Sequence, residues 1–340
     1  MNQHPHRGRF ASLSGVAVLF GVLVGGCASS SSPGIKAAEP SKALDQYVSG
    51  YQAYKKGQTD LARQNFEAAV LNNPDLRMAR VVLGEIYRNQ NDYNLAARQY
   101  EVLVRLDPYT LNNHYYLGVS YQFLTRYKES AVAYLKGLKL SPNDFKSNMN
   151  LGTVYLSVGE TEEAVRYLDK ATQLDPNSSV AWSNLGVALD AKNSLVLAET
   201  AYRKALERNP DSQAIMQNLA NNLVAQKKVG ESKMLWEQIV SKNKTSFSQT
   251  KLAETYTAAL EFPQAMKLLD EVIGRDPRYV PAINAKATSL IHQYELSGFT
   301  DDKLRIAAVD LLQRSLAING NQPRVTDELK KWAKSSAIRQ

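Results

Sequence analysis

The sequence predicts an all-α protein built as a solenoid of stacked helix–turn–helix pairs. Prolines recur at intervals of 34 residues, at Pro74, Pro108, Pro142, Pro176 and Pro210. In the same register the chain repeats a short phrase, as "LGEIY", "LGVSY", "LGTVY" and "LGVAL". Between these phrases a small residue is followed four positions later by a large one, as in Ala62/Phe66, Ala96/Tyr100, Ser130/Tyr134, Ala164/Leu168 and Ala198/Tyr202. A repeat of this length holds two helices, which bury their apolar faces only when neighbouring repeats stack.

Residues 1–26 have the layout of an export signal. Arg7 and Arg9 form a basic start, and the stretch from residue 11 to residue 26 is uncharged and mostly apolar. Glycines and serines interrupt it, so it falls short of the roughly 18 apolar residues that a membrane-spanning helix needs. We therefore expect this segment to direct export rather than to span the membrane.

The only cysteine, Cys27, follows this segment in the sequence "VGGC", which resembles a bacterial lipobox. The resemblance implies cleavage before Cys27 and attachment of lipid to it, with several acyl chains, since one chain alone holds a protein only marginally at a membrane. The alternative is an ordinary signal peptide with an incidental cysteine. Ala28 stands where an aspartate commonly retains such proteins at the inner membrane, which favours the outer membrane, facing the periplasm. Residues 27–42 are then a lipidated flexible tether.

The repeated units closely resemble tetratricopeptide (TPR) repeats, which implies a TPR superhelix with an extended concave groove. Units start near residues 43, 77, 111, 145, 179, 213 and 246, and this array spans residues 43–277. The sixth unit is degraded, with Ala220 in place of glycine and Ser232 in place of alanine, and it is one residue short. We expect altered superhelix geometry around residues 242–248.

Residues 278–340 are predicted to form a divergent eighth repeat followed by a C-terminal capping helix. Helices are expected near residues 281–293 and 303–317, with Ala308 and Leu312 at the small and large positions and extra residues around "ELSGFTDD". The polar segment after Pro323 has Trp332 as its main apolar anchor. An array of stacked repeats needs such a polar end to stay soluble.

Charge does not point to nucleic acid as a partner. The chain has a formal net charge of +8, and removing the two arginines of residues 1–26 leaves about +6, with basic and acidic residues interspersed. An exported protein does not meet the chromosome. The basic end of the chain is better explained as a solvated helix face, or at most as a contact for anionic lipid or glycan.

In the TPR family the groove is lined by positions 2, 5, 6, 9, 12 and 13 of the first helix in each unit. Counting these positions places two kinds of candidate partner-binding residue there. The first and third units offer Tyr47, Tyr51, Tyr115 and Tyr116, and tyrosine is enriched at recognition surfaces. The alternative is that some of these rings pack between helices. We expect Glu85 and Arg88, in the second unit, to be solvated.

The fourth to sixth units place Asn150, Asn184 and Asn218 at position 6, and Asn221 follows at position 9. An amide can pair with both the N–H and the C=O of one peptide unit, so such a row suits an extended peptide of any sequence. The row resembles the asparagine ladder of O-linked N-acetylglucosamine transferases. The alternative is that asparagine is simply common at this position of the family.

No catalytic site, metal site or cofactor site is predicted. The sequence lacks a glycine-rich phosphate loop, HExxH and G-x-S-x-G, and its histidines beyond the signal, His114 and His292, lie in distant units. We therefore expect no enzyme activity and no small-molecule substrate.

Taken together, these features predict a membrane-anchored scaffold of the bacterial cell envelope that binds envelope proteins, as an extended peptide or a helix, in the groove. The resemblance extends to lipoproteins of type IV and tight-adherence pilus assembly. The alternatives are an adaptor for cell-wall hydrolases or polysaccharide export, and a regulatory subunit of an envelope enzyme.

Overall fold

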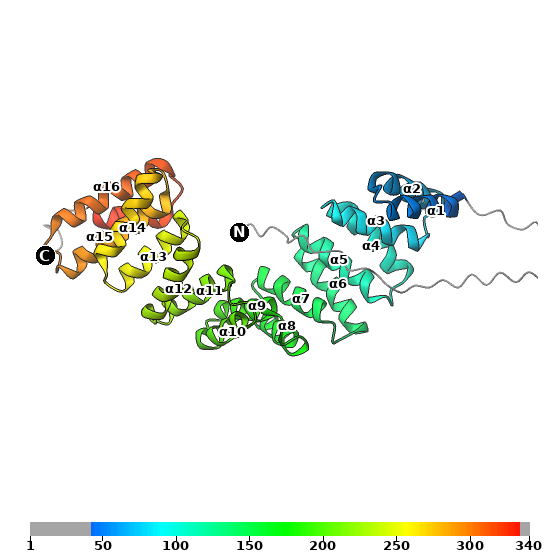
Figure 1. The fold of residues 1–340 in the computed structure, drawn as a ribbon, viewed down its shortest axis with the longest axis horizontal. Coiled ribbons are helices and arrows are strands. Elements are labelled where there is room, and N and C mark those ends of the chain that lie inside the picture. Colours follow the sequence, from blue (N-terminus) through cyan, green and yellow to red (C-terminus); the bar gives the residue numbers. More distant parts are fainter. Residues whose placement is uncertain (1–41, 334–340) are drawn as a thin grey trace, which may run out of the picture. The chain divides into compact units, whose positions relative to one another are not determined.

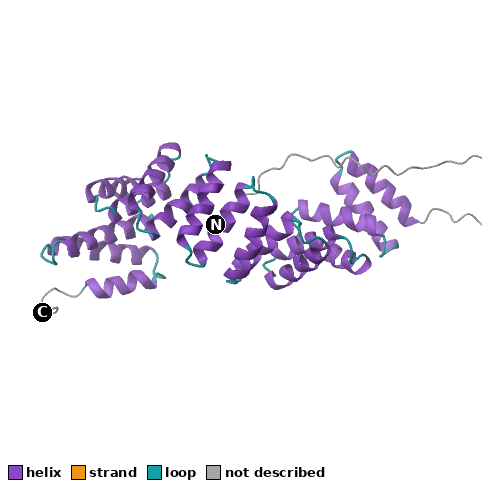
Figure 2. Ribbon diagram, turned by 90° about the horizontal axis from the view of Figure 1, so that it is seen from below, coloured by secondary structure: helices purple, strands orange, loops and turns teal. Residues whose placement is uncertain are grey.

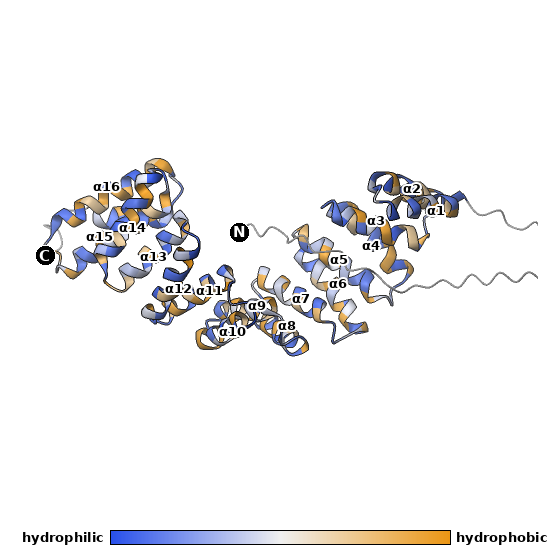
Figure 3. Ribbon diagram, viewed as in Figure 1, coloured by the Kyte–Doolittle hydropathy of each residue, from blue (hydrophilic) through white to orange (hydrophobic). Residues whose placement is uncertain are grey.

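The structure is a computed structural model of the 340-residue chain, and residues 42–333 are described. The predicted signal, Cys27, the tether up to residue 41 and the end of the chain from residue 334 lie outside the described residues. Within residues 42–333 every regular element is an α-helix (Figure 2), which confirms the all-α solenoid. Polar and apolar residues alternate along each of these helices (Figure 3), and none of them has both the length and the apolar character that crossing a bilayer requires.

Seventeen helices form the described part of the chain, in eight pairs and one terminal helix (Figure 1). The first helices of the pairs are α1 (Lys42–Lys55), α3 (Arg77–Asn89), α5 (Leu111–Phe123), α7 (Phe145–Ser157), α9 (Ser179–Ala191), α11 (Gln213–Ala225), α13 (Ser246–Ala258) and α15 (Val280–Leu296). The second helices are α2 (Thr59–Asn72), α4 (Tyr93–Leu106), α6 (Tyr127–Leu140), α8 (Thr161–Leu174), α10 (Leu195–Arg208), α12 (Val229–Lys242), α14 (Phe262–Arg275) and α16 (Asp302–Ile318), and α17 (Pro323–Trp332) follows. Each helix packs mainly against its neighbours in the chain.

Each of the first seven pairs is joined by a three-residue turn whose middle residue has a left-handed backbone. These residues are Gly57, Asn91, Thr125, Gly159, Asn193, Lys227 and Leu260. In the second pair, for example, the N–H of Asn91 donates to the carbonyl of Arg88 and the N–H of Asp92 to that of Tyr87. This bonding satisfies the last carbonyls of the first helix and reverses the chain.

The prolines of the 34-residue repeat lie in the linkers between pairs. Six of the seven linkers that join one pair to the next have four residues, but the linker between α12 and α13 has three, residues 243–245. There Thr245 caps α13: its hydroxyl accepts from the N–H of Ser248, whose hydroxyl accepts from the N–H of Thr245, both at 3.0 Å. The single-residue shortening of the sixth unit is thus located in this linker.

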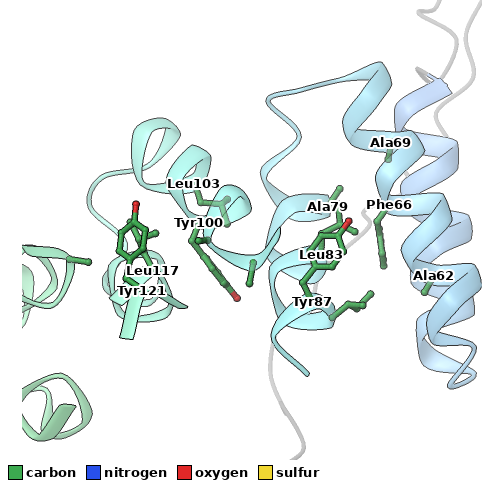
Figure 4. Packing of buried hydrophobic residues seen from close by; sticks show 14 of the residues in the cluster. Ala62, Phe66, Ala69, Ala79, Leu83, Tyr87, Tyr100, Leu103, Leu117 and Tyr121 are labelled. Carbon is green, nitrogen blue, oxygen red and sulfur yellow. The ribbon is translucent and has the colours of Figure 1, made fainter. Parts of the chain in front are cut away.

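The core consists of small and large side chains from both helices of the units, gathered in successive clusters along the array. Figure 4 shows Phe66, Tyr87 and Tyr100 among the buried residues between neighbouring helices. The close approach depends on glycine in the first helix, because a Cβ on Gly84 would lie 2.7 Å from the Tyr100 ring. Each fully buried large side chain stabilises the fold by about 1.5–3 kcal/mol, so stacking holds the array together.

The eighth pair departs from the repeat by lengthening. Helices α15 and α16 have 17 residues each, against 13 or 14 in the seven earlier pairs, and a five-residue turn joins them. Ala308 and Leu312 are buried, as the sequence predicts. Helix α17 closes this end of the array: Trp332 is 1% exposed, and its ring lies edge-on to Tyr294 with 6.0 Å between centroids.

Candidate functional site

The candidate binding residues lie on the first helices of five units, α1, α5, α7, α9 and α11. We call the face formed by positions 2, 5, 6, 9, 12 and 13 of the first helices the groove side. The structure separates the candidates into rings that pack on one another and amides that differ in their bonding.

On α1, Tyr47 and Tyr51 form one stacked pair. Their ring centroids are 6.1 Å apart and the planes differ by 15°, while Tyr47 also contacts Phe66 at 5.7 Å. Tyr51 is 41% exposed and lies under the ammonium group of Lys55. Tyr47 therefore supports the core, and Tyr51 is the ring available to a partner.

The prediction that Glu85 and Arg88, on α3, are solvated is wrong, since both side chains are partly buried. Burial, followed by the charge and hydrogen bonding of Glu85, raises the pKa of Tyr54 to about 12. The Arg88 guanidinium lies over the Tyr116 ring, 4.0 Å from its centroid. The second unit thus links the rings of the first unit to those of the third.

On α5, Tyr115 and Tyr116 are both partly buried and contact each other edge to face, with 5.1 Å between centroids. Tyr116 also stacks on Tyr100 at 5.5 Å, and Tyr115 contacts Tyr134 at 5.9 Å. Burial raises the pKa of Tyr115. These rings form an aromatic surface that is only partly open to a ligand.

Asn150, the first member of the asparagine row, is already engaged. Its Nδ2 donates to the hydroxyl of Tyr134 at 3.2 Å and to that of Tyr115 at 3.4 Å. The amide therefore offers a partner only its carbonyl oxygen, and it ties α7 to the aromatic surface. Sequence spacing could not reveal this contact, because the hydroxyls come from the preceding unit.

Asn184 on α9 and Asn218 on α11 are partly buried, and neither side chain has a hydrogen-bond partner within residues 42–333. Both functions of each amide, donor and acceptor, are therefore free for a ligand. Asn221 is exposed and lines a small hollow of about 130 Å³ with Val224 and Trp236. Of the four asparagines, only Asn150 thus has a side-chain hydrogen bond within the described residues.

Sequence analysis missed a polar network between the fifth and sixth units. Asp190 accepts from Tyr202 at 2.7 Å and from Asn222 at 2.5 Å. Close by, burial would raise the pKa of Glu199, but hydrogen bonds from Lys228, Gln226 and Arg203 outweigh it and lower the pKa to about 2. The contacts that join the two units could not be predicted from sequence spacing, since Asn222, Gln226 and Lys228 lie 27 to 32 positions from their partners.

A family model described as tetratricopeptide repeat matches residues 47–109, 115–179 and 149–213. These residues form tetratricopeptide repeats. The match falls on the first five units, each of which ends at one of the prolines of the 34-residue register. The resemblance seen in the sequence is therefore confirmed for the fold, and the TPR fold is typical of scaffolds that bind other proteins rather than of enzymes.

Solved TPR structures are similar to this chain at the level of the fold. A tetratricopeptide repeat protein from Parabacteroides merdae shares 16% identity with a TM-score of 0.52, covering 86% of this chain and 99% of its own. The pilF structure from Pseudomonas aeruginosa shares 19% identity with a TM-score of 0.51, covering 61% of this chain and 94% of its own. No curated protein matches the sequence.

Within residues 42–333 no three His, Cys, Asp or Glu side chains gather in a way that could hold a metal ion. His114, on α5, and His292, on α15, belong to different parts of the array. These two histidines therefore do not share a site.

Proposed function

We propose that this protein is a lipid-anchored scaffold of the bacterial cell envelope, which recruits other envelope proteins by binding a segment of each in its groove. The observation that carries the proposal is the pair of partly buried amides of Asn184 and Asn218, which have no partner in the described chain. They stand one repeat apart on successive first helices, so an extended peptide can run across both. The aromatic surface supplies apolar contact area at the other end.

The binding mode follows from the different states of the three amides. Asn184 and Asn218 can each pair with an N–H and a C=O of a peptide backbone, whereas Asn150 can only accept. Backbone pairing gives affinity without demanding a particular sequence, and selectivity then comes from side chains that fit beside Tyr51 and Tyr116. This arrangement suits a scaffold that binds segments differing in sequence.

Anchoring at the outer membrane is proposed from the "VGGC" motif at Cys27 followed by Ala28. The test is to express the natural protein and Cys27→Ser in a Gram-negative host with radioactive palmitate. We expect label and membrane fractionation for the natural protein and loss of both for Cys27→Ser. A Cys27→Ser protein that still fractionates with outer membranes would refute the lipid anchor.

The finer proposal is a role in assembling a pilus or the outer-membrane secretin through which it passes. It is supported by the combination of a lipobox with a TPR array and by the fold-level likeness to the pilF structure. A photo-cross-linking residue at position 184 in living cells tests it, with a probe at position 71, on α2, as a matched control, because Leu71 is 82% exposed. Specific capture of a secretin or pilus subunit at position 184 supports the role.

The other outcomes of the same experiment are informative. A wall hydrolase or an export protein captured at position 184 keeps the scaffold and changes its process. Capture that is equal at positions 184 and 71 contradicts binding in the groove.

A further inference from the structure

A hollow of about 300 Å³ lies between α4 and α6, and we call it the outer hollow. Its apolar lining comes from Val104 on α4, Leu117 and Tyr121 on α5, and Val132 and Ala133 on α6. Val132 is 52% exposed, whereas Leu117 and Tyr121, which are 7% and 9% exposed, lie deeper. Its residues on α5 stand at positions 4, 7 and 11, none of which is a groove position. The outer hollow is therefore a surface separate from the groove side.

The outer hollow exists because two positions of the third unit hold short or turned-away side chains. These are position 4 of the first helix and position 7 of the second helix. In the second unit they hold Arg80 and Gln99, whose side chains meet in a hydrogen bond of 2.8 Å. In the third unit they hold His114, whose Nε2 donates to the carbonyl of Pro108 at 2.8 Å, and Ala133. An alanine cannot form such a bridge, so the space beside it stays open.

The fourth unit shows which kind of group fills this space. Tyr167 stands one repeat after Ala133, at the same position of its helix. Its ring stacks on that of Tyr155, with 5.6 Å between centroids and 13° between planes. Tyr155 is the equivalent of Tyr121, and the guanidinium of Arg166 lies over the Tyr167 ring at 4.5 Å. An aromatic ring covered by a cation therefore occupies the equivalent place one unit along.

The fifth unit repeats this combination with a ring from its first helix. Trp182 stands two repeats after His114, at the same position, and the ammonium group of Lys204 lies over its indole at 4.2 Å. Lys204 is the equivalent of Lys136, which lines the outer hollow. The third unit thus has the cation of this arrangement without the ring.

Two lysines at the outer hollow carry uncompensated charge. Lys128 and Lys136 are exposed, and within residues 42–333 neither makes an ion pair or contacts a ring. The acidic residue of the wall, Glu129, is paired with Arg126 at 3.0 Å, and the Arg126 guanidinium also lies over the Tyr121 ring. An occupant that complements this site has an apolar body with negative charge beside it.

We propose that the outer hollow binds an aromatic side chain of a second protein, from a segment with an acidic residue on each side of the ring. The ring packs on Leu117 and Val132, in the place that Tyr167 fills in the fourth unit, and the ammonium group of Lys136 covers it. The two carboxylates pair with Lys128 and Lys136. A volume of about 300 Å³ is near the lower limit for ligand sites and suits a single side chain. This second site does not depend on the groove.

The test uses the full-length protein in lipid nanodiscs and a blocked tripeptide of aspartate, 5-fluorotryptophan and aspartate as the probe. Binding is measured as a fluorine NMR titration, and we expect it to saturate. Replacing both aspartates of the probe by lysine should weaken binding by about fivefold or more, because two ion pairs become repulsive. A tripeptide with alanine in place of the ring should not displace the probe. Binding that does not saturate, or equal binding of the lysine form, overturns the proposal.

Variants of the protein assign the binding to the outer hollow. Ala133→Tyr recreates the arrangement of the fourth unit and should weaken binding of the probe by about tenfold or more, since the hollow is then filled by the chain's own ring. Lys128→Gln combined with Lys136→Gln should weaken binding by about fivefold and reduce its dependence on salt. The matched control is Lys170→Gln, one repeat after Lys136, which should leave binding unchanged. Unchanged binding in a folded Ala133→Tyr protein, or in the double lysine variant, overturns the assignment.

Two other occupants would be recognised by the same approach. Octanoate that competes with the probe at equal affinity would make the outer hollow a site for acyl chains and overturn the proposal. A photo-cross-linking residue at position 132 in living cells that yields only a dimer of this chain would make the occupant a second copy, with the same consequence. Cross-linking at position 184 reports on the groove alone, so failure of the outer hollow and failure of the proposed function are distinguishable.

Discussion

Replacing Gly186 by alanine tests how closely the two helices of the fifth unit approach. A Cβ at this position would lie 2.5 Å from Cε1 of Tyr202 and 2.7 Å from its Cδ1, closer than real Cβ atoms come. The Tyr202 ring is 1% exposed, and its hydroxyl donates to Asp190 at 2.7 Å. The ring cannot move aside without losing this hydrogen bond, so α9 and α10 must separate.

The expected change in the free energy of unfolding on Gly186→Ala is the sum of one stabilising and two destabilising contributions. Alanine in place of glycine in a helix gains up to about 1 kcal/mol of stability. Forcing a methyl group into a well-packed core costs about 1–3 kcal/mol, and loss of the Tyr202–Asp190 bond adds about 1 kcal/mol. We expect Gly186→Ala to lower the free energy of unfolding of this region by about 1–3 kcal/mol.

The assay is equilibrium urea unfolding combined with native-state hydrogen exchange, because long repeat arrays need not unfold in a single step. Slowly exchanging amides of α9 and α10 should become less protected than those of α3 and α4. The matched control is Gly274→Ala on α14, where an added Cβ meets nothing within 4 Å, and it should be neutral or stabilising by about 0.5 kcal/mol. If Gly186→Ala stabilises as much as Gly274→Ala, the close approach described here is wrong.

Three further predictions concern a turn, a buried carboxylate and the two unpaired amides. Thr125→Gly should stabilise by about 0.5–1 kcal/mol in urea unfolding because Thr125 has φ 58, whereas Asn193→Gly at φ 60 should change little, since asparagine tolerates this backbone. Glu199→Gln should destabilise by about 1–2 kcal/mol at pH 7; because the folded pKa is lowered from 4.5 to about 2, this difference should shrink as the pH falls through that window, measured as thermal midpoints. Asn184→Ala with Asn218→Ala should abolish partner cross-linking near the aromatic surface while the thermal midpoint moves little, and collapse of the fold would make both amides structural.

Much of the fold could be predicted because the same sequence pattern recurs in successive units. The 34-residue register fixes which residues pair, and the structure places Ala62 and Phe66, like their equivalents in later units, in the core. The turns within the units were harder to predict from the sequence, since Asn, Thr, Lys and Leu occupy the same left-handed position as Gly57. There the turn geometry is imposed by packing of the two helices and overrides the preference of each residue.

The candidate site was predicted only in part, because periodicity identifies a face but not the partners of each side chain. Asn150 and Asn184 occupy equivalent positions, yet only Asn150 meets two tyrosine hydroxyls. Arg88 was expected in solvent, but the Tyr116 ring of the next unit lies beneath it. Contacts between units depend on which residues happen to face each other across the stack.

The sequence by itself determined the all-α architecture, the number and register of the repeats and the small and large residues of the core. These are local and periodic properties, repeated often enough to leave no alternative. Only the tertiary structure decided which polar atoms are satisfied. The free amides of Asn184 and Asn218, and the engaged amide of Asn150, depend on neighbours up to 35 residues away. Hydrogen bonding is directional and short-ranged, so it is fixed only once the helices have stacked.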